Sequence, residues 1–170
     1  MVDAQSFLFC DLERELAVTR KVLAVVPGEK FEWKPHAKSM SLGKLAIHVA
    51  TLPEWMANAL AQDVLDFANA PRPPQEVADN AALMALFEER VKGLKEAVAG
   101  FDPQTWEKMW TMKNGAQIFT QQPRWKVYKS WCFNHLIHHR GQLCVYLRLL
   151  DVKVPVVYFN TADEPDFVFE

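Results

Sequence analysis

The chain has 170 residues, a formal net charge of −2, and acidic and basic residues interspersed along its length. This length suits one hydrophobic core, so we expect residues 1–170 to form a single domain. Half of the residues are apolar, but no apolar run approaches the roughly 20 residues that span a bilayer, and we expect no membrane contact. The mixed charges exclude the basic face that binds a phosphate backbone, so nucleic acid is not an expected partner.

The N-terminal residues and the cysteines indicate a cytoplasmic protein. No basic residue precedes the apolar segment Phe7-Leu8-Phe9, as a secretory signal would require. Cys10, Cys132 and Cys144 are odd in number, show no C-x-x-C spacing and fall within predicted helices. This pattern is typical of reduced thiols packed as small apolar groups.

Four segments have the apolar spacing of helices, and the first two fill most of the N-terminal half. The first covers residues 4–26. The second begins after Ser39 or Ser41, because either side chain can cap the free amides of a first turn. It is expected to end before the proline-rich segment 71–74, with a kink at Pro53, which removes one backbone hydrogen bond.

The third and fourth predicted helices cover residues 79–99 and 123–150. Residues 101–122, between them, are rich in aromatic and polar side chains without a clear period, and we expect them to cover one end of the helices. The apolar, β-branched tail 152–158 is expected to fold back onto the helices. Four long helices around one core predict an all-α four-helix bundle with a short C-terminal tail packed on it.

Three of the five histidines have a spacing that suits a metal site. His135 and His139 are four residues apart on the fourth predicted helix, so both side chains lie on one face and can reach one ion. His48 lies at the edge of the apolar face of the second helix. A lone histidine there is more often a hydrogen-bonded core residue, so its assignment as a ligand depends on the pair.

Three neutral imidazoles on facing helices would form a site that suits zinc, nickel, iron or copper and leaves coordination positions open for water or substrate. His138 is turned away from its neighbour His139, and His36 lies in a predicted loop, so we expect neither to be a ligand. Gln142 and Tyr146 continue the face of the histidine pair by one and two turns. They are expected to line the pocket or to form hydrogen bonds within it.

Arg140 and Gly141, which follow His139, are both unusual in a helix. Gly141 costs roughly 1 kcal/mol relative to alanine, and we expect a close approach by another helix there. Arg140 lies near the apolar face, so it must either reach solvent or pair with a carboxylate, for which Asp11 and Glu15 are the candidates.

Other catalytic patterns are missing from the sequence. It contains no H-E-x-x-H, no E-x-x-H, no G-x-S-x-G and no glycine-rich phosphate loop. A serine triad or the use of a nucleotide is therefore unsupported, and no catalytic residue is assigned.

Several segments along nearly the whole chain carry a resemblance to a known family. They are Trp33-Lys34-Pro35, Ser39-Met40-Ser41-Leu42-Gly43 before His48, the segment 135–143, Tyr146-Leu147-Arg148, and Val154-Pro155 with Tyr158. In these segments the chain resembles the DinB family of DinB/YfiT-like metalloenzymes. The resemblance implies an up-down-down-up four-helix bundle in which His48, His135 and His139 bind one divalent metal ion, commonly zinc or nickel. The tail differs, because Phe159-Asn160 stand where relatives often have Gly-Pro.

The resemblance also implies two alternative functions. Characterised relatives transfer or isomerise small molecules with low-molecular-weight thiols such as bacillithiol or mycothiol, which favours a metal-dependent transferase with a small-molecule substrate. The alternative is a non-catalytic, metal-stabilised bundle that acts as a stress-related dimer or interaction protein. We expect a homodimer for two reasons. One is the resemblance, and the other is the presence of four tryptophans, whose aromatic surface is more than one small bundle is expected to bury. They are Trp55, Trp106, Trp110 and Trp125.

Overall fold

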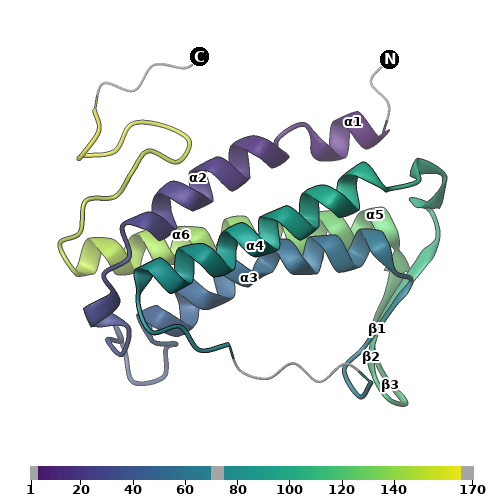
Figure 1. Cartoon of the computed structure of the whole chain (residues 1–170), viewed down its shortest axis with the longest axis horizontal. Coiled ribbons are helices and arrows are strands. Elements are labelled where there is room, and N and C mark those ends of the chain that lie inside the picture. Colours follow the sequence, from purple (N-terminus) through teal and green to yellow (C-terminus); the bar gives the residue numbers. More distant parts are fainter. Residues whose placement is uncertain (1–3, 70–74, 166–170) are drawn as a thin grey trace.

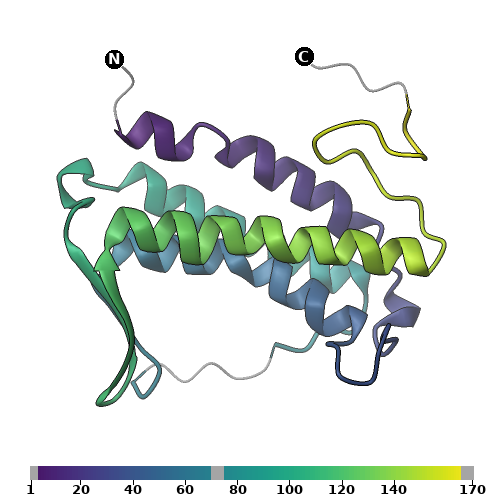
Figure 2. The same cartoon turned by 180° about the vertical axis from the view of Figure 1, so that it is seen from behind.

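The computed structural model describes residues 4–69 and 75–165, in which long helices run side by side with a small sheet at one end (Figure 1). The helices α2 and α6 run in one direction, and α3 and α4 run in the opposite direction (Figures 1 and 2). Each of these four helices packs mainly on two others, since α3 packs on α4 and α6, and α2 packs on the same two. The helices are α1 (Ala4–Phe9), α2 (Leu12–Ala24), α3 (Leu42–Ala61), α4 (Asn80–Ala99), α5 (Arg124–Lys126), a π-helical segment (Val127–Phe133) and α6 (Asn134–Leu149).

The first predicted helix is divided into α1 and α2 by a turn at Cys10 and Asp11. The break lets α1 place the ring of Phe9 in an aromatic cluster, 5.3 Å from the ring centroid of Tyr128 and 5.6 Å from that of Trp106. Edge-on and tilted contacts of this kind stabilise the fold beyond the effect of the area that the rings bury. The prediction of one helix over residues 4–26 is therefore correct only in part.

The second predicted helix begins where a cap was expected but ends early. The Ser41 hydroxyl accepts a hydrogen bond from the amide of Lys44 at 3.3 Å, and α3 continues through Pro53. It ends at Ala61, and the chain then becomes extended. The prolines that were expected to end this helix lie within residues 70–74, outside the described residues.

Buried Arg124 caps the C-terminus of α3. Its guanidinium donates to the carbonyls of Ala59 and Leu60, both at 2.8 Å, and of Gln62 at 3.1 Å, and it pairs with the Asp63 carboxylate. The last carbonyls of a helix have no partner within it, so a cation here satisfies them and opposes the negative end of the helix dipole. This contact joins the end of α3 to the start of the last helix.

Residues 109–123, nearly all within the segment expected to be a cover, contribute two strands to a three-stranded sheet, so the prediction of an all-α fold is wrong. The strand order is β1-β2-β3, with β1 parallel to β2 and β2 antiparallel to β3. The sheet lies at one end of the bundle, where a cover was expected (Figures 1 and 2). The strands are β1 (Val64–Asp66), β2 (Met109–Asn114) and β3 (Gln117–Pro123).

The hairpin of β2 and β3 has a clear local cause. The two-residue turn Gly115-Ala116 joins the strands, since Asn114 pairs with Gln117, and Gly115 has a φ of +58°, which glycine adopts without steric cost. The Gly115 amide donates to the carboxylate of Asp66 at 2.9 Å, which ties β1 to the turn. Trp110 and Met112, two residues apart on β2, are both buried in the core, so the strand covers the end of the bundle.

The C-terminal tail folds back onto the bundle. Asp151 ends the last helix with a φ of 58°, and Val154 and Val156 are buried. The carboxylate of Asp163 accepts from the amide of Val154 at 2.9 Å and pairs with Arg148. These contacts explain how the tail is held without regular secondary structure.

Two sequence-based predictions need correction, one on the packing of the cysteines and one on the exposure of the tryptophans. Cys132 is buried and Cys144 half-buried, but Cys10 is exposed, so only two of the three free thiols are packed. Trp106 and Trp110 are buried, while Trp55 is half-buried and Trp125 is 37% exposed, so the basis for an aromatic dimer surface is smaller than expected. The homodimer stays a prediction.

In the part of the chain that the structure describes, no helix is long and apolar enough to span a membrane.

Arg140 lies in the core and pairs with Glu15, one of the two predicted partners. The distance from Nη2 to the Glu15 carboxylate is 2.5 Å, and the two side chains are 1% and 2% exposed. Arg140 also donates to the Glu15 carbonyl at 3.1 Å, to the Thr19 hydroxyl at 3.2 Å and to the Tyr158 hydroxyl at 3.3 Å. Tyr158 in turn donates to the Glu15 carboxylate at 3.1 Å, so the network joins α2, α6 and the tail. By contrast, no helix of the described residues approaches Gly141, where an added Cβ would meet none of their atoms within 4 Å, so that prediction is wrong.

Replacing Arg140 by methionine is expected to lower the free energy of unfolding by about 3 to 5 kcal/mol, because the Glu15 carboxylate stays buried without its partner. The double variant Arg140→Met/Glu15→Gln should lose less than the sum of the two single changes, since neither charge remains. Urea unfolding measures the free energy of unfolding of the wild type and of each variant. Lys95→Met is the control, because it breaks an exposed pair with Glu13 and should cost less than about 1 kcal/mol. Additive losses in the double variant would contradict the pairing.

Candidate metal centre

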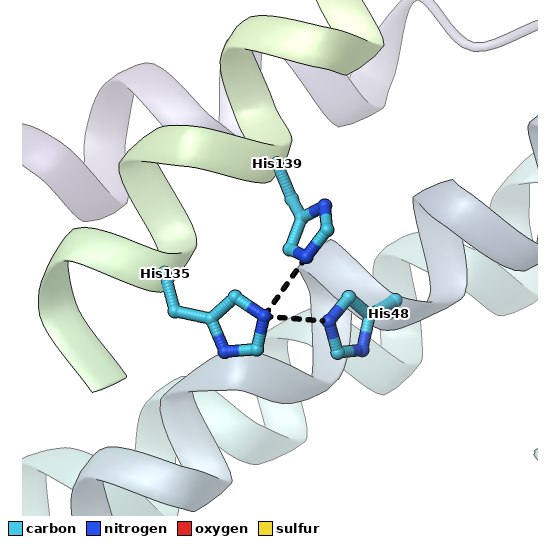
Figure 3. Close-up of side chains that lie close together, drawn as sticks. All are labelled: His48, His135 and His139. Atoms are coloured by element: carbon cyan, nitrogen blue, oxygen red, sulfur yellow. Dashed lines mark hydrogen bonds between the residues drawn. The ribbon is translucent and has the colours of Figure 1, made fainter. Parts of the chain in front are cut away.

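His48 on α3 and His135 and His139 on α6 point toward one another across the contact between the two helices (Figure 3). The Nε2 atom of His135 lies 3.3 Å from Nε2 of His48 and 2.8 Å from Nε2 of His139. The potential ligand atoms of the three residues all lie within 4.8 Å of one another, and each side chain is partly buried. The structure therefore brings together the three histidines that the sequence singled out.

The separations of the ring nitrogens suit a shared metal ion. Ligand nitrogens about 2.0 to 2.1 Å from a metal lie roughly 3.3 Å apart in a tetrahedron and roughly 2.9 Å apart at neighbouring corners of an octahedron. The observed separations of 3.3 Å and 2.8 Å lie near the range that these two geometries span. Among the described residues, no cysteine, aspartate, glutamate or further histidine joins this group. The donor set thus fits one divalent ion with coordination positions left over.

Burial keeps the three imidazoles neutral, which is the form that binds metal. Desolvation is the largest cause that lowers the pKa of His48, to about 4, and the neighbouring His139 and His135 lower it further. Desolvation also lowers the pKa of His135 and that of His139. Neutral rings offer lone pairs to a cation at neutral pH.

Gln142 and Tyr146 make different contacts although they share a helix face. The Gln142 Oε1 lies 2.7 Å from Nδ1 of His139, so this side chain contacts a histidine of the cluster directly. Tyr146 donates to the backbone oxygen of Met40 at 3.3 Å, and its ring meets that of Trp33 at 5.7 Å. Tyr146 therefore holds the loop that precedes α3.

The two remaining histidines lie outside the cluster. His138 is exposed, and its ring packs beside that of His139 with centroids 4.8 Å apart. His36 is also exposed, and its Nδ1 accepts from the amide of Lys38 at 3.1 Å.

A surface depression of about 380 Å³ borders the cluster on the side of His135. Its other lining residues are Ser130, Trp131, Asn134 and His138. The Trp131 side chain is 44% exposed, and its backbone forms a hydrogen bond with His135. Sequence spacing carries no signal for Ser130, Trp131 or Asn134, because the first two lie within a π-helical segment that shifts the helical period and Asn134 directly follows it.

A family model matches residues 1–166 and is described as the DinB family. The chain belongs to the DinB family. Two solved structures of DinB-like proteins resemble this DinB protein, each over 89% of the chain. The protein of Bacillus subtilis has a TM-score of 0.70 at 17% identity, with 97% of its own chain covered. The protein of Bacillus cereus has a TM-score of 0.67 at 20% identity, with 95% covered.

A third similar structure, from Exiguobacterium sibiricum, is also described as a DinB family member. Its TM-score is 0.65 at 19% identity, and the match covers 92% of this chain and 97% of that chain. At these identities the structures establish the shared fold. None of the curated protein sequences matches significantly.

The lowered pKa of His48 predicts a pH-dependent stability for this DinB protein in the presence of a chelator. The unfolded chain takes up a proton on His48 as the pH falls below about 6.5, whereas the folded protein does so only at about 4. The free energy of unfolding should therefore decrease as the pH is lowered from about 6.5 to about 4. The expected decrease is about 1 to 2 kcal/mol once the partial exposure of His48 is allowed for. Urea unfolding at several pH values measures this.

The variant His48→Gln should show a shallower fall than the wild type over the same pH range. His36→Gln is the matched control, because His36 is exposed and outside the cluster, so its curve should follow the wild type. Parallel curves for the wild type and His48→Gln would contradict the assigned cause.

Proposed function

We propose that this DinB protein binds one divalent metal ion through His48, His135 and His139, and that it is a transferase acting with a low-molecular-weight thiol. The observation that carries the proposal is the convergence of three Nε2 atoms at the spacing of a coordination shell. Zinc and nickel suit an all-imidazole donor set, and iron(II) is also compatible with it.

When bound, the ion supplies positive charge that favours the anionic form of a thiol near neutral pH. The thiolate sulfur then forms a bond to an electrophilic carbon, the leaving group departs with the electron pair of the broken bond, and the thiol proton passes to solvent. His48, His135 and His139 would hold the ion. Among the described residues no further ligand joins them, so part of the coordination shell is left free. These features support an enzyme over a purely structural ion.

The cysteines of the chain are poor candidates for the nucleophile. Burial raises the pKa of the Cys132 thiol to about 12, and its sulfur lies 3.5 Å from the backbone oxygen of Trp55. Burial also raises the pKa of Cys144. Cys10 lies in the turn between α1 and α2 and is outside the histidine cluster. A thiol from solution is therefore the nucleophile that the proposal requires.

Each of the variants His48→Ala, His135→Ala and His139→Ala is expected to lose stoichiometric metal, because each removes one ligand. The wild type should bind about one equivalent of zinc or nickel and should unfold at a higher temperature when loaded, since the ion binds the folded state. Elemental analysis after dialysis measures the stoichiometry.

His138→Ala is the matched control, because it removes a neighbouring imidazole that lies outside the cluster and should retain the metal. Full occupancy in His135→Ala would overturn the ligand assignment.

Thiol transfer is tested with protein to which zinc or nickel has been restored. Bacillithiol, mycothiol or glutathione is incubated with a haloarene or an epoxide, and the loss of free thiol is followed. The rate should exceed the uncatalysed background, vanish in His139→Ala, and survive in Cys132→Ala and Cys144→Ala. Absence of turnover with all three thiols, together with an ion closed by a fourth protein ligand, would leave the non-catalytic, metal-stabilised bundle as the function.

A further inference from the structure

We propose that Gln142 is a positioning residue for the metal centre, which keeps the proton of His139 on Nδ1 and so directs the lone pair of Nε2 to the ion. The inference rests on the proposed metal site. It assigns a specific task to a side chain that sequence spacing could place only on the same face as the histidines.

The hydrogen bond between the two side chains defines where the proton sits. Gln142 follows His139 by three residues on α6, and its Oε1 lies 2.7 Å from the His139 Nδ1. An amide oxygen only accepts, so in this orientation of the Gln142 amide Nδ1 donates and carries the hydrogen. In the neutral ring Nε2 is then unprotonated, and this is the atom that lies 2.8 Å from Nε2 of His135.

His135 and His139 are held by different kinds of partner. His135 forms a hydrogen bond with the backbone of Trp131, which no substitution of a side chain removes. His139 is held by a side chain that is itself exposed. Partners of this kind fix the tautomer and the ring orientation of a metal-binding histidine, and their loss typically costs about 10- to 100-fold in metal affinity. The role of Gln142 is therefore open to a direct test.

The test compares variants that keep or remove the acceptor at position 142. Gln142→Leu removes it and should weaken zinc binding by about 10- to 100-fold in a competition assay with a chromophoric chelator. Gln142→Glu keeps an oxygen acceptor and should bind zinc at least as tightly as the wild type. Val145→Glu adds the same charge at an exposed position on α6 without an acceptor for His139, and it separates the effect of charge from that of the hydrogen bond.

A second measurement reports the tautomer without metal. Nitrogen-15 chemical shifts of the imidazole rings, recorded at pH 8 with a chelator, should show His139 protonated on Nδ1 in the wild type and in Gln142→Glu. In Gln142→Leu they should show a mixture of the two tautomers. Tyr146→Phe, one turn further along the same face, should leave these shifts unchanged, because its hydroxyl contacts Met40 instead.

The outcomes separate this inference from the proposed function. If the wild type binds no metal, the proposed function fails, while the nitrogen-15 shifts still decide the role of Gln142. If the wild type binds zinc and Gln142→Leu binds it equally well with an unchanged tautomer, the positioning role is overturned. Loss of affinity in Gln142→Glu as large as in Gln142→Leu would also overturn it.

Discussion

The buried ion pair between Arg140 and Glu15 constrains the rest of the site. Both side chains are almost fully shielded from water, so each charge depends on the other, and the pair locks α6 to α2. Arg140 directly follows His139, and successive residues of a helix point about 100° apart. Turning Arg140 toward α2 therefore leaves His139 and His135 free to face α3. The rotation of one helix thus serves both the core and the histidine cluster.

Local spacing predicted the parts of the molecule that depend on a regular helix. The separation of His135 and His139 by four residues required them to share a face, and Ser41 caps α3 as its residue type predicts. The sequence limited Arg140 to reaching solvent or pairing with a carboxylate, and the structure shows the second, with Glu15 as the partner. His48 could be assigned only together with the His135/His139 pair and the family resemblance, since a single histidine on an apolar face carries no information about its partner.

The sheet escaped prediction because its pairing is not local. β1 pairs with β2 across more than forty residues of intervening chain, and a three-residue strand has no period that a sequence pattern can reveal. Only the turn at Gly115-Ala116 is encoded locally. The early end of α3 has a similar cause, because it depends on Arg124, which reaches the last carbonyls of that helix from the start of the C-terminal helix.

The C-terminal helix shows where helical spacing stops being a reliable guide to the site. Its π-helical segment, Val127–Phe133, adds residues per turn and so rotates everything before Asn134 relative to the histidine face. Trp131, within this segment, contacts His135 through its backbone, and side-chain spacing cannot predict such a contact. After the π segment the helix is regular, and Gln142 falls on the face expected. The two histidines of α6 therefore rest on supports of different origin, one set by backbone irregularity and the other by regular helical geometry.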